Sequence, residues 1–234
     1  MDRLRSLIGR TVSASKVGVR RQMTSERRQL TGVRRGDAAH EDSLRAMLSD
    51  NPNNEQAFRA LAEIVRRHAT APREDEDPLT ASLDPTARAR QADLAVWALA
   101  EEFSGNPRAW YPLLELARLS IQHDHDGAIR RLATAAERDS TGEALAEGLA
   151  ILREANLNGE AIGLGIGQWR PLEHTPQAAK HLIGAMLDSG RPFDARRYLE
   201  AIRTHRDTEA AAAVAAEFAD RIAQAESDAM PERH

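Results

Sequence analysis

The chain of 234 residues contains no cysteine, which excludes disulfide bonds, thiolate zinc sites and catalytic cysteines. Aromatic residues make up only 4% of the sequence, which is less typical of sheet proteins than of helices packed through small side chains. No apolar run approaches the roughly 20 residues of a membrane-spanning helix. We therefore expect an all-α protein with no transmembrane segment, located in the reducing cytoplasm.

Lysine is also scarce, since only Lys16 and Lys180 among the 32 basic residues are lysines. This bias is common in GC-rich genomes, and the composition beyond the N-terminus is typical of a bacterial protein. Residues 1–22 contain arginine, serine and a single acid, as mitochondrial transit peptides do. Because the basic character continues past Gln22, we favour a bacterial cytoplasmic protein, with peripheral attachment to a membrane or a large assembly as an alternative.

Positive charge is concentrated at the N-terminus. Residues 1–36 contain ten basic and two acidic side chains, a net charge of +8, whereas residues 37–234 contain 22 basic and 34 acidic side chains, a net charge of −12. Segments of such different charge have different partners. We therefore predict a basic N-terminal arm over residues 1–38, separate from an acidic body.

The arm contains a seven-residue repeat of arginine pairs, in which RRQMTSE at 20–26 is followed by RRQLTGV at 27–33 and then by a third pair. In a helix, seven residues rise about 10 Å, which would place the pairs along one edge. The glycines of the arm equally allow disorder until a partner binds. We expect the arm to contact nucleic acid, a ribosome, an acidic protein or an anionic membrane surface. The predicted contacts are Arg20, Arg21, Arg27, Arg28, Arg34 and Arg35.

The body repeats a helix, turn, helix pattern with a measurable period. Ala128, Ala161 and Ala195 each stand near the start of a second helix, and they are separated by 33 and 34 residues. An apolar stripe with helical spacing precedes each of them, as at Leu145 and Leu149. Such a period predicts stacked antiparallel helix hairpins.

These features resemble the tetratricopeptide repeat, a 34-residue unit of two antiparallel helices closed by a turn that often contains proline. The best match runs from Pro176 to Asp207, and the Asn-Pro turns at residues 50–54 and 105–107 resemble the turns between repeats of that family. The resemblance implies an α-solenoid of such hairpins over residues 39–207. An acidic, proline-containing loop at about 71–85 interrupts the first hairpin.

Two further expectations accompany the resemblance. An alanine-rich segment over residues 208–227 is expected to form a C-terminal capping helix, followed by a tail over residues 228–234. In the family, ligands lie in a concave groove and contact the exposed face of each first helix. The matching positions in this chain are Arg59, Glu63, Arg66, Tyr111, Glu115, Arg118, Arg153 and Lys180.

Three motifs contain residue types found in catalytic or metal-binding sites, but none has the spacing or the structural context that such a site requires. Gly163 to Gly167 has alternate glycines without the preceding strand or the spacing of a dinucleotide-binding loop, so we interpret them as helix-packing glycines or as the site of a strained, kinked helix. His123 to Asp126 are adjacent in a turn and seldom converge on one ion. His174 and His181 belong to no His-Glu-x-x-His motif. We expect no catalytic residue, metal or cofactor.

The predicted function is that of a non-catalytic adaptor or scaffold, which binds a protein or peptide in its groove while the arm contacts an anionic partner. One alternative is a nucleic-acid-associated or ribosome-associated factor, in which the arm binds and the repeats act as a spacer. Another is a structural subunit whose arm is an assembly element.

Overall fold

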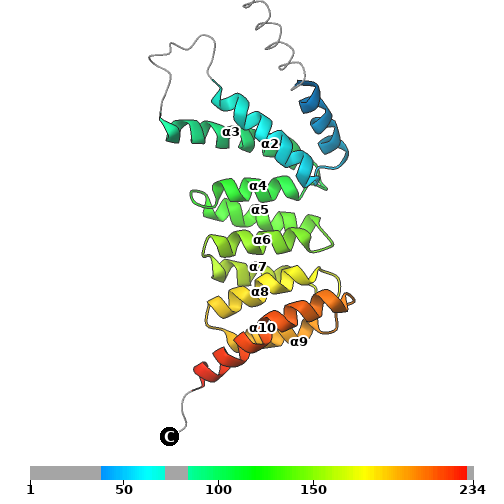
Figure 1. Ribbon diagram of the computed structural model, residues 1–234, viewed down its shortest axis with the longest axis vertical. Coiled ribbons are helices and arrows are strands. Elements are labelled where there is room, and N and C mark those ends of the chain that lie inside the picture. The colour runs from blue at the N-terminus through cyan, green and yellow to red at the C-terminus, as the bar shows by residue number, and fades with distance from the viewer. Residues whose placement is uncertain (1–37, 72–83, 231–234) are drawn as a thin grey trace, which may run out of the picture. The chain divides into compact units, whose positions relative to one another are not determined.

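The computed structural model describes residues 38–71 and 84–230 (Figure 1). This part of the chain contains α-helices and no strand, so the prediction of an all-α protein is confirmed for it. The arm arginines and most of the acidic loop lie outside the described residues. The chain divides into two units between residues 46 and 47, and of the first unit the structure describes residues 38–46. A helix over residues 38–50 begins in the first unit and ends in the second.

The second unit, which we call the helical body, is a succession of helices joined mostly by short turns. They are α2 (Glu55–Thr70), α3 (Pro85–Ser104), α4 (Tyr111–Ser120), α5 (His125–Arg138), α6 (Glu143–Glu154), α7 (Asn158–Gln168), α8 (Pro176–Asp188), α9 (Pro192–Ile202) and α10 (Thr208–Ala229). The last of these includes the whole segment that was predicted to form the C-terminal helix.

Each helix packs against its neighbour in the chain (Figure 1). The hairpins are α2 with α3, α4 with α5, α6 with α7, and α8 with α9, while α10 packs against both α8 and α9. Contacts of α6 with α4 and α8 join first helices of successive hairpins, and contacts of α5 with α7 join second helices. Every hairpin therefore buries its apolar side chains partly against the next one.

The three alanines that revealed the period occupy equivalent positions in the structure. Ala128, Ala161 and Ala195 are each the fourth residue of their helix, α5, α7 and α9 respectively. All three are completely buried. A methyl side chain at this position lets the second helix lie close to its neighbours, which explains why alanine recurs at this spacing.

Helix ends follow the capping chemistry that their sequences contain. Asn54 and Asp124 each accept a hydrogen bond, at 3.0 Å, from a backbone N–H in the first turn of α2 and α5. At the other end, Asn156 after α6 and Gly190 after α8 have positive φ angles of 61° and 67°. In both cases their N–H groups and those of the next residue donate to carbonyls of the last helical turn, as in a Schellman motif.

Hydrogen bonds also join the turns of successive hairpins. The side chain of Asn53, in the turn before α2, donates to the carbonyl oxygen of Arg108 at 2.8 Å. Its own oxygen accepts from the N–H groups of Trp110 and Tyr111, at 2.7 and 3.1 Å. Because Trp110 provides no side-chain cap for α4, the preceding hairpin supplies it.

The next two turns are linked in a similar way. Arg138, the last residue of α5, donates from one guanidinium nitrogen to three backbone carbonyls, those of Ser104, Asn106 and Ala109, at 2.9, 3.1 and 2.9 Å. Further along, the N–H of Thr175 donates to the carbonyl of Thr141 at 2.7 Å. The adjacent Gly142 has a φ of 80°, and a Cβ there would lie only 2.4 Å from the Cβ of His174. Glycine is therefore required at this contact.

The alternate glycines of α7 have different environments within one continuous helix. A Cβ added at Gly165 would lie 2.6 Å from a methyl carbon of the fully buried Leu182, whereas Cβ atoms added at Gly163 or Gly167 would meet nothing within 4 Å. The interpretation as helix-packing glycines is confirmed for Gly165 and is wrong for the other two.

This difference predicts opposite effects for one substitution at two sites of the same helix. Gly163→Ala should raise the free energy of unfolding by about 1 kcal/mol, because alanine favours helix and the site is open. Gly165→Ala should lower it by about 1 to 3 kcal/mol, because Leu182 must move in a packed core. Urea denaturation measures both, and equal changes would show that the packing of α7 on α8 is described incorrectly.

Candidate protein-binding face

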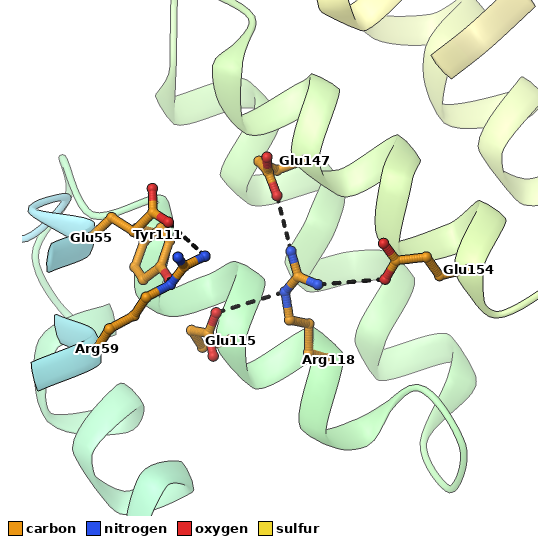
Figure 2. A network of polar contacts seen from close by, with 7 residues as sticks. All are labelled: Glu55, Arg59, Tyr111, Glu115, Arg118, Glu147 and Glu154. Atoms are coloured by element: carbon orange, nitrogen blue, oxygen red, sulfur yellow. Dashed lines mark hydrogen bonds and ion pairs between the residues drawn. The ribbon is translucent and has the colours of Figure 1, made fainter. Parts of the chain in front are cut away.

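The eight residues predicted to contact a ligand lie on the first helices of the hairpins. Arg59, Glu63 and Arg66 are on α2, and the remainder are on α4, α6 and α8. We call this set the first-helix face: Arg59, Glu63, Arg66, Tyr111, Glu115, Arg118, Arg153 and Lys180. The structure brings several of them together through polar contacts, which Figure 2 shows for α2, α4 and α6.

Arg118 is the centre of the largest cluster. Its guanidinium lies 3.7 Å from Glu115 on the same helix, and 2.9 and 3.6 Å from Glu147 and Glu154 on α6 (Figure 2). Its side chain is 35% exposed, so water weakens each pair, but three carboxylates act on one cation. The cluster links α4 to α6 and carries more negative than positive charge.

Arg59 and Tyr111 link α2 to α4. The Nε of Arg59 donates to the hydroxyl oxygen of Tyr111 at 3.3 Å, and Glu55 forms an ion pair with the same guanidinium (Figure 2). Tyr111 is only 5% exposed, and its ring lies edge-on against Phe58 with centroids 5.4 Å apart. Burial raises the pKa of Tyr111 to about 12, an effect to which Glu115 adds.

Tyr111 therefore differs from the sequence-based expectation, which placed it on the exposed face. The expectation is wrong because an aromatic side chain at the first residue of α4 packs against Phe58 of α2. Its hydroxyl remains protonated at neutral pH and serves as a hydrogen-bonding group for Arg59.

Ion pairs also link α6, α8 and α10. Arg153 lies 2.8 Å from Asp188, and Arg221 of α10 lies 3.9 Å from the same carboxylate. The guanidinium of Arg153 lies against Gly184, where a Cβ would come within 2.7 Å of it. Lys180 lies 2.8 Å from Glu217 of α10. These contacts continue the row of inter-helix charge pairs beyond Arg118.

Glu63 and Arg66 are the exceptions on this face. Glu63 is exposed and Arg66 is half-buried, and the described residues offer neither side chain an ion-pair partner. Sequence reasoning placed Asp188 on this face but did not pair it with Arg153, and it missed the other carboxylates that pair with these cations, namely Glu147, Glu154 and Glu217. Helical spacing could have placed Glu147 and Glu154, seven residues apart, on one side of α6, but it could not have assigned them to Arg118.

The chemistry of the face is ionic and hydrogen-bonding. Within residues 38–71 and 84–230, no three His, Asp or Glu side chains are grouped so that they could hold a metal ion. The turn at His123 to Asp126 begins α5, since Asp124 accepts from Gly127 and pairs with Arg131 at 3.2 Å. The hydrogen bond from Arg131 lowers the pKa of Asp124.

None of the described helices is long and apolar enough to cross a membrane.

Two histidines are removed from water to different extents, since His174 is buried and His181 is half-buried. His174 is 3% exposed, and its Nδ1 accepts a weak hydrogen bond, at 3.4 Å, from the N–H of Arg170. Burial lowers the pKa of His174, and the positive charge of Arg170 lowers it further. Burial also lowers the pKa of His181, with contributions from Arg153 and Lys180. Both imidazoles are favoured in the neutral form.

Comparison with known proteins identifies no relative. No protein-family model, curated protein or solved structure matches this chain. The assignment of the first-helix face to binding therefore depends on its geometry and charges.

The lowered pKa values of His174 and His181 predict that acid destabilises the fold. Because the folded pKa values of His174 and His181 lie below the usual value of about 6.5, the unfolded chain binds more protons as the pH falls below that value. The free energy of unfolding should decrease from pH 7.5 to pH 5.5, and the decrease should be smaller in a His174→Gln, His181→Gln variant. Stability that is constant or rises over this interval would contradict the burial of these side chains.

Proposed function

We propose that this protein is a non-catalytic cytoplasmic adaptor. In this proposal, α2 to α10 form an α-solenoid of tetratricopeptide-like hairpins that holds a protein or peptide segment along the first-helix face, and the arm contacts an anionic partner. The observation that supports the proposal is that the predicted ligand-binding residues lie on the first helices α2, α4, α6 and α8, which are linked in this order by the Arg59–Tyr111 hydrogen bond and by helix contacts. An extended segment could meet several of these helices in turn.

The charges of the face indicate where specificity would arise. A partner that binds Arg118, Arg153 or Lys180 must compete with carboxylates that already lie within 2.9 Å of each of them. Glu63 and Arg66 have no such competitor among the described residues. Charged groups of a partner therefore gain most binding free energy at α2. The paired charges on α4, α6 and α8 contribute mainly a complementary shape and hydrogen-bonding groups.

A second candidate function depends on the arm. Ten basic residues in the first 36 favour a polyanion such as nucleic acid or ribosomal RNA, with the helical body as a spacer. Binding of this kind weakens steeply with salt because counterions are released from the polyanion. Binding at the first-helix face, where isolated charges of both signs are present, should weaken less with salt than binding of a polyanion to the arm.

Quantitative affinity capture from the native cell, followed by binding assays on the partner identified, tests the proposal with three variants. Exchange of the charges of Glu63 and Arg66 (Glu63→Arg with Arg66→Glu) should weaken binding of the main partner at least tenfold. The control is the same exchange at Arg130 and Glu137 on α5, which are exposed and unpaired within the described part, and it should leave binding unchanged. The third variant replaces the six arm arginines by glutamine.

The arm variant separates the two functions. The adaptor proposal expects its melting temperature within about 2 °C of the wild type, with the partner of the face retained and an anionic partner lost. The polyanion function expects every partner to be lost, and wild-type binding to fall about tenfold or more between 50 and 200 mM salt. Equal binding by the α2 and α5 exchange variants would contradict a role for the first-helix face.

A further inference from the structure

A hollow of about 250 Å³ lies on the second helices, away from the residues of the first-helix face. It is formed by α7, the turn that follows it, and α9. Its lining residues are Ile166, Trp169, Pro171, Arg197, Tyr198 and Ala201. Pockets for drug-sized ligands usually occupy 300 to 1,000 Å³, so this open hollow suits one side chain better than a cofactor.

Five of the six residues that line the hollow have apolar or aromatic side chains. The rings of Trp169 and Tyr198 are in contact, with centroids 5.3 Å apart and planes inclined at 42°. Ile166 is 48% exposed at the edge, and Leu172, which follows Pro171 in the chain, is 53% exposed. Aromatic and aliphatic side chains grouped in this way gain free energy when an apolar group of a partner covers them.

Two polar groups at the hollow lack complementary partners. The guanidinium of Arg197 lies over the ring of Tyr198, 5.3 Å from its centroid, and no carboxylate of the described residues pairs with it. The indole N–H of Trp169 is covered and finds no hydrogen-bond acceptor in the same part of the chain. An acid could therefore bind the guanidinium of Arg197, whereas the indole N–H of Trp169 is already covered by the protein.

Three glycines leave one side of α7 without side chains. Gly159, Gly163 and Gly167 recur every four residues on one side of the helix, and a Cβ at any of them would meet nothing within 4 Å. Glycine lowers helix stability relative to alanine, and these three gain no packing in the described structure. Together with the hollow, they leave room for the backbone of another segment to approach α7 closely.

We propose that this hollow binds a protein segment in which an apolar side chain the size of leucine adjoins a carboxylate. The apolar side chain lies against Ile166, Trp169 and Tyr198, and the carboxylate pairs with Arg197. The positive charge of Arg197 selects against a basic segment, and the apolar walls select against nucleic acid. The site shares no residue with the first-helix face, so it stands independently of the proposed function.

Nuclear magnetic resonance of the full-length, ¹⁵N-labelled protein tests the proposal. The protein has three tryptophans, and a Trp169→Phe variant assigns the indole N–H resonance of Trp169. The probe is the peptide acetyl-Gly-Asp-Leu-Asp-Gly-amide. The Trp169 resonance should shift saturably with a Kd of about 1 mM, as a short peptide with one apolar anchor would give, while the other two indole resonances stay in place.

Matched peptides and variants make the charge requirement measurable. Peptides with asparagine or lysine in place of both aspartates should bind at least fivefold more weakly. Arg197→Gln should weaken binding of the aspartate peptide to a similar extent, whereas Arg206→Gln, at an exposed position after α9, should leave it unchanged. Both variants should keep the circular dichroism spectrum of the wild type.

Three outcomes would overturn the proposal. One is the absence of a saturable shift with the aspartate peptide at 10 mM. Another is equal binding of the aspartate and lysine peptides. The third is a Trp169 resonance that moves on dilution of the protein alone, which would assign the hollow to contact between two copies of this chain.

Discussion

The hydrogen bonds from Arg138 to three carbonyls of the preceding inter-hairpin turn constrain the spacing of the hairpins. One guanidinium nitrogen at the end of α5 holds the carbonyls of Ser104, Asn106 and Ala109, and it thereby fixes the second hairpin at the point where α3 ends and α4 begins. The side chain of Asn53 joins the turn before α2 to this same turn before α4. The N–H of Thr175 joins the turn before α8 to the turn before α6. Apolar burial is non-directional, and directional hydrogen bonds between turns add to side-chain packing a constraint on the register of the helices.

Both surfaces on which binding is proposed depend on this register. Arg118 reaches Glu147 and Glu154 only because α4 and α6 are adjacent at a fixed offset, and Arg153 meets Asp188 across the next interface. Among the second helices, α7 lies close to Leu182 of α8 at Gly165. The helix is continuous there, and Cβ atoms added at its other glycines would meet nothing within 4 Å. The first surface consists mostly of paired charges, with Glu63 and Arg66 as the exceptions, and the second of apolar side chains with an unpaired cation. The two surfaces therefore suit partners of different chemistry.

Local and periodic properties could be predicted from the sequence, and contacts between distant side chains could not. The alanines at 128, 161 and 195 were identifiable because a fully buried, small residue must recur with the repeat. The same reasoning placed Tyr111 on the surface, because helical spacing contains no information about the pocket beside Phe58 that receives its ring. It treated the glycines of α7 alike, although only Gly165 faces Leu182. The partners of Arg153 and Lys180, and two of the three partners of Arg118, come from other helices, and no motif signals them.

The role of the turns is tested most directly by the free energy of unfolding of an Arg138→Ala variant. Loss of a charged donor from three carbonyls should lower it by about 2 kcal/mol, as measured by urea denaturation. Arg130→Ala is the matched control, since Arg130 is an exposed arginine of the same helix whose guanidinium has no hydrogen bond or ion pair with the described residues, and it should change stability by less than about 0.5 kcal/mol. A loss in the Arg138 variant no larger than in the control would contradict the view that hydrogen bonds between turns set the register of the helical body.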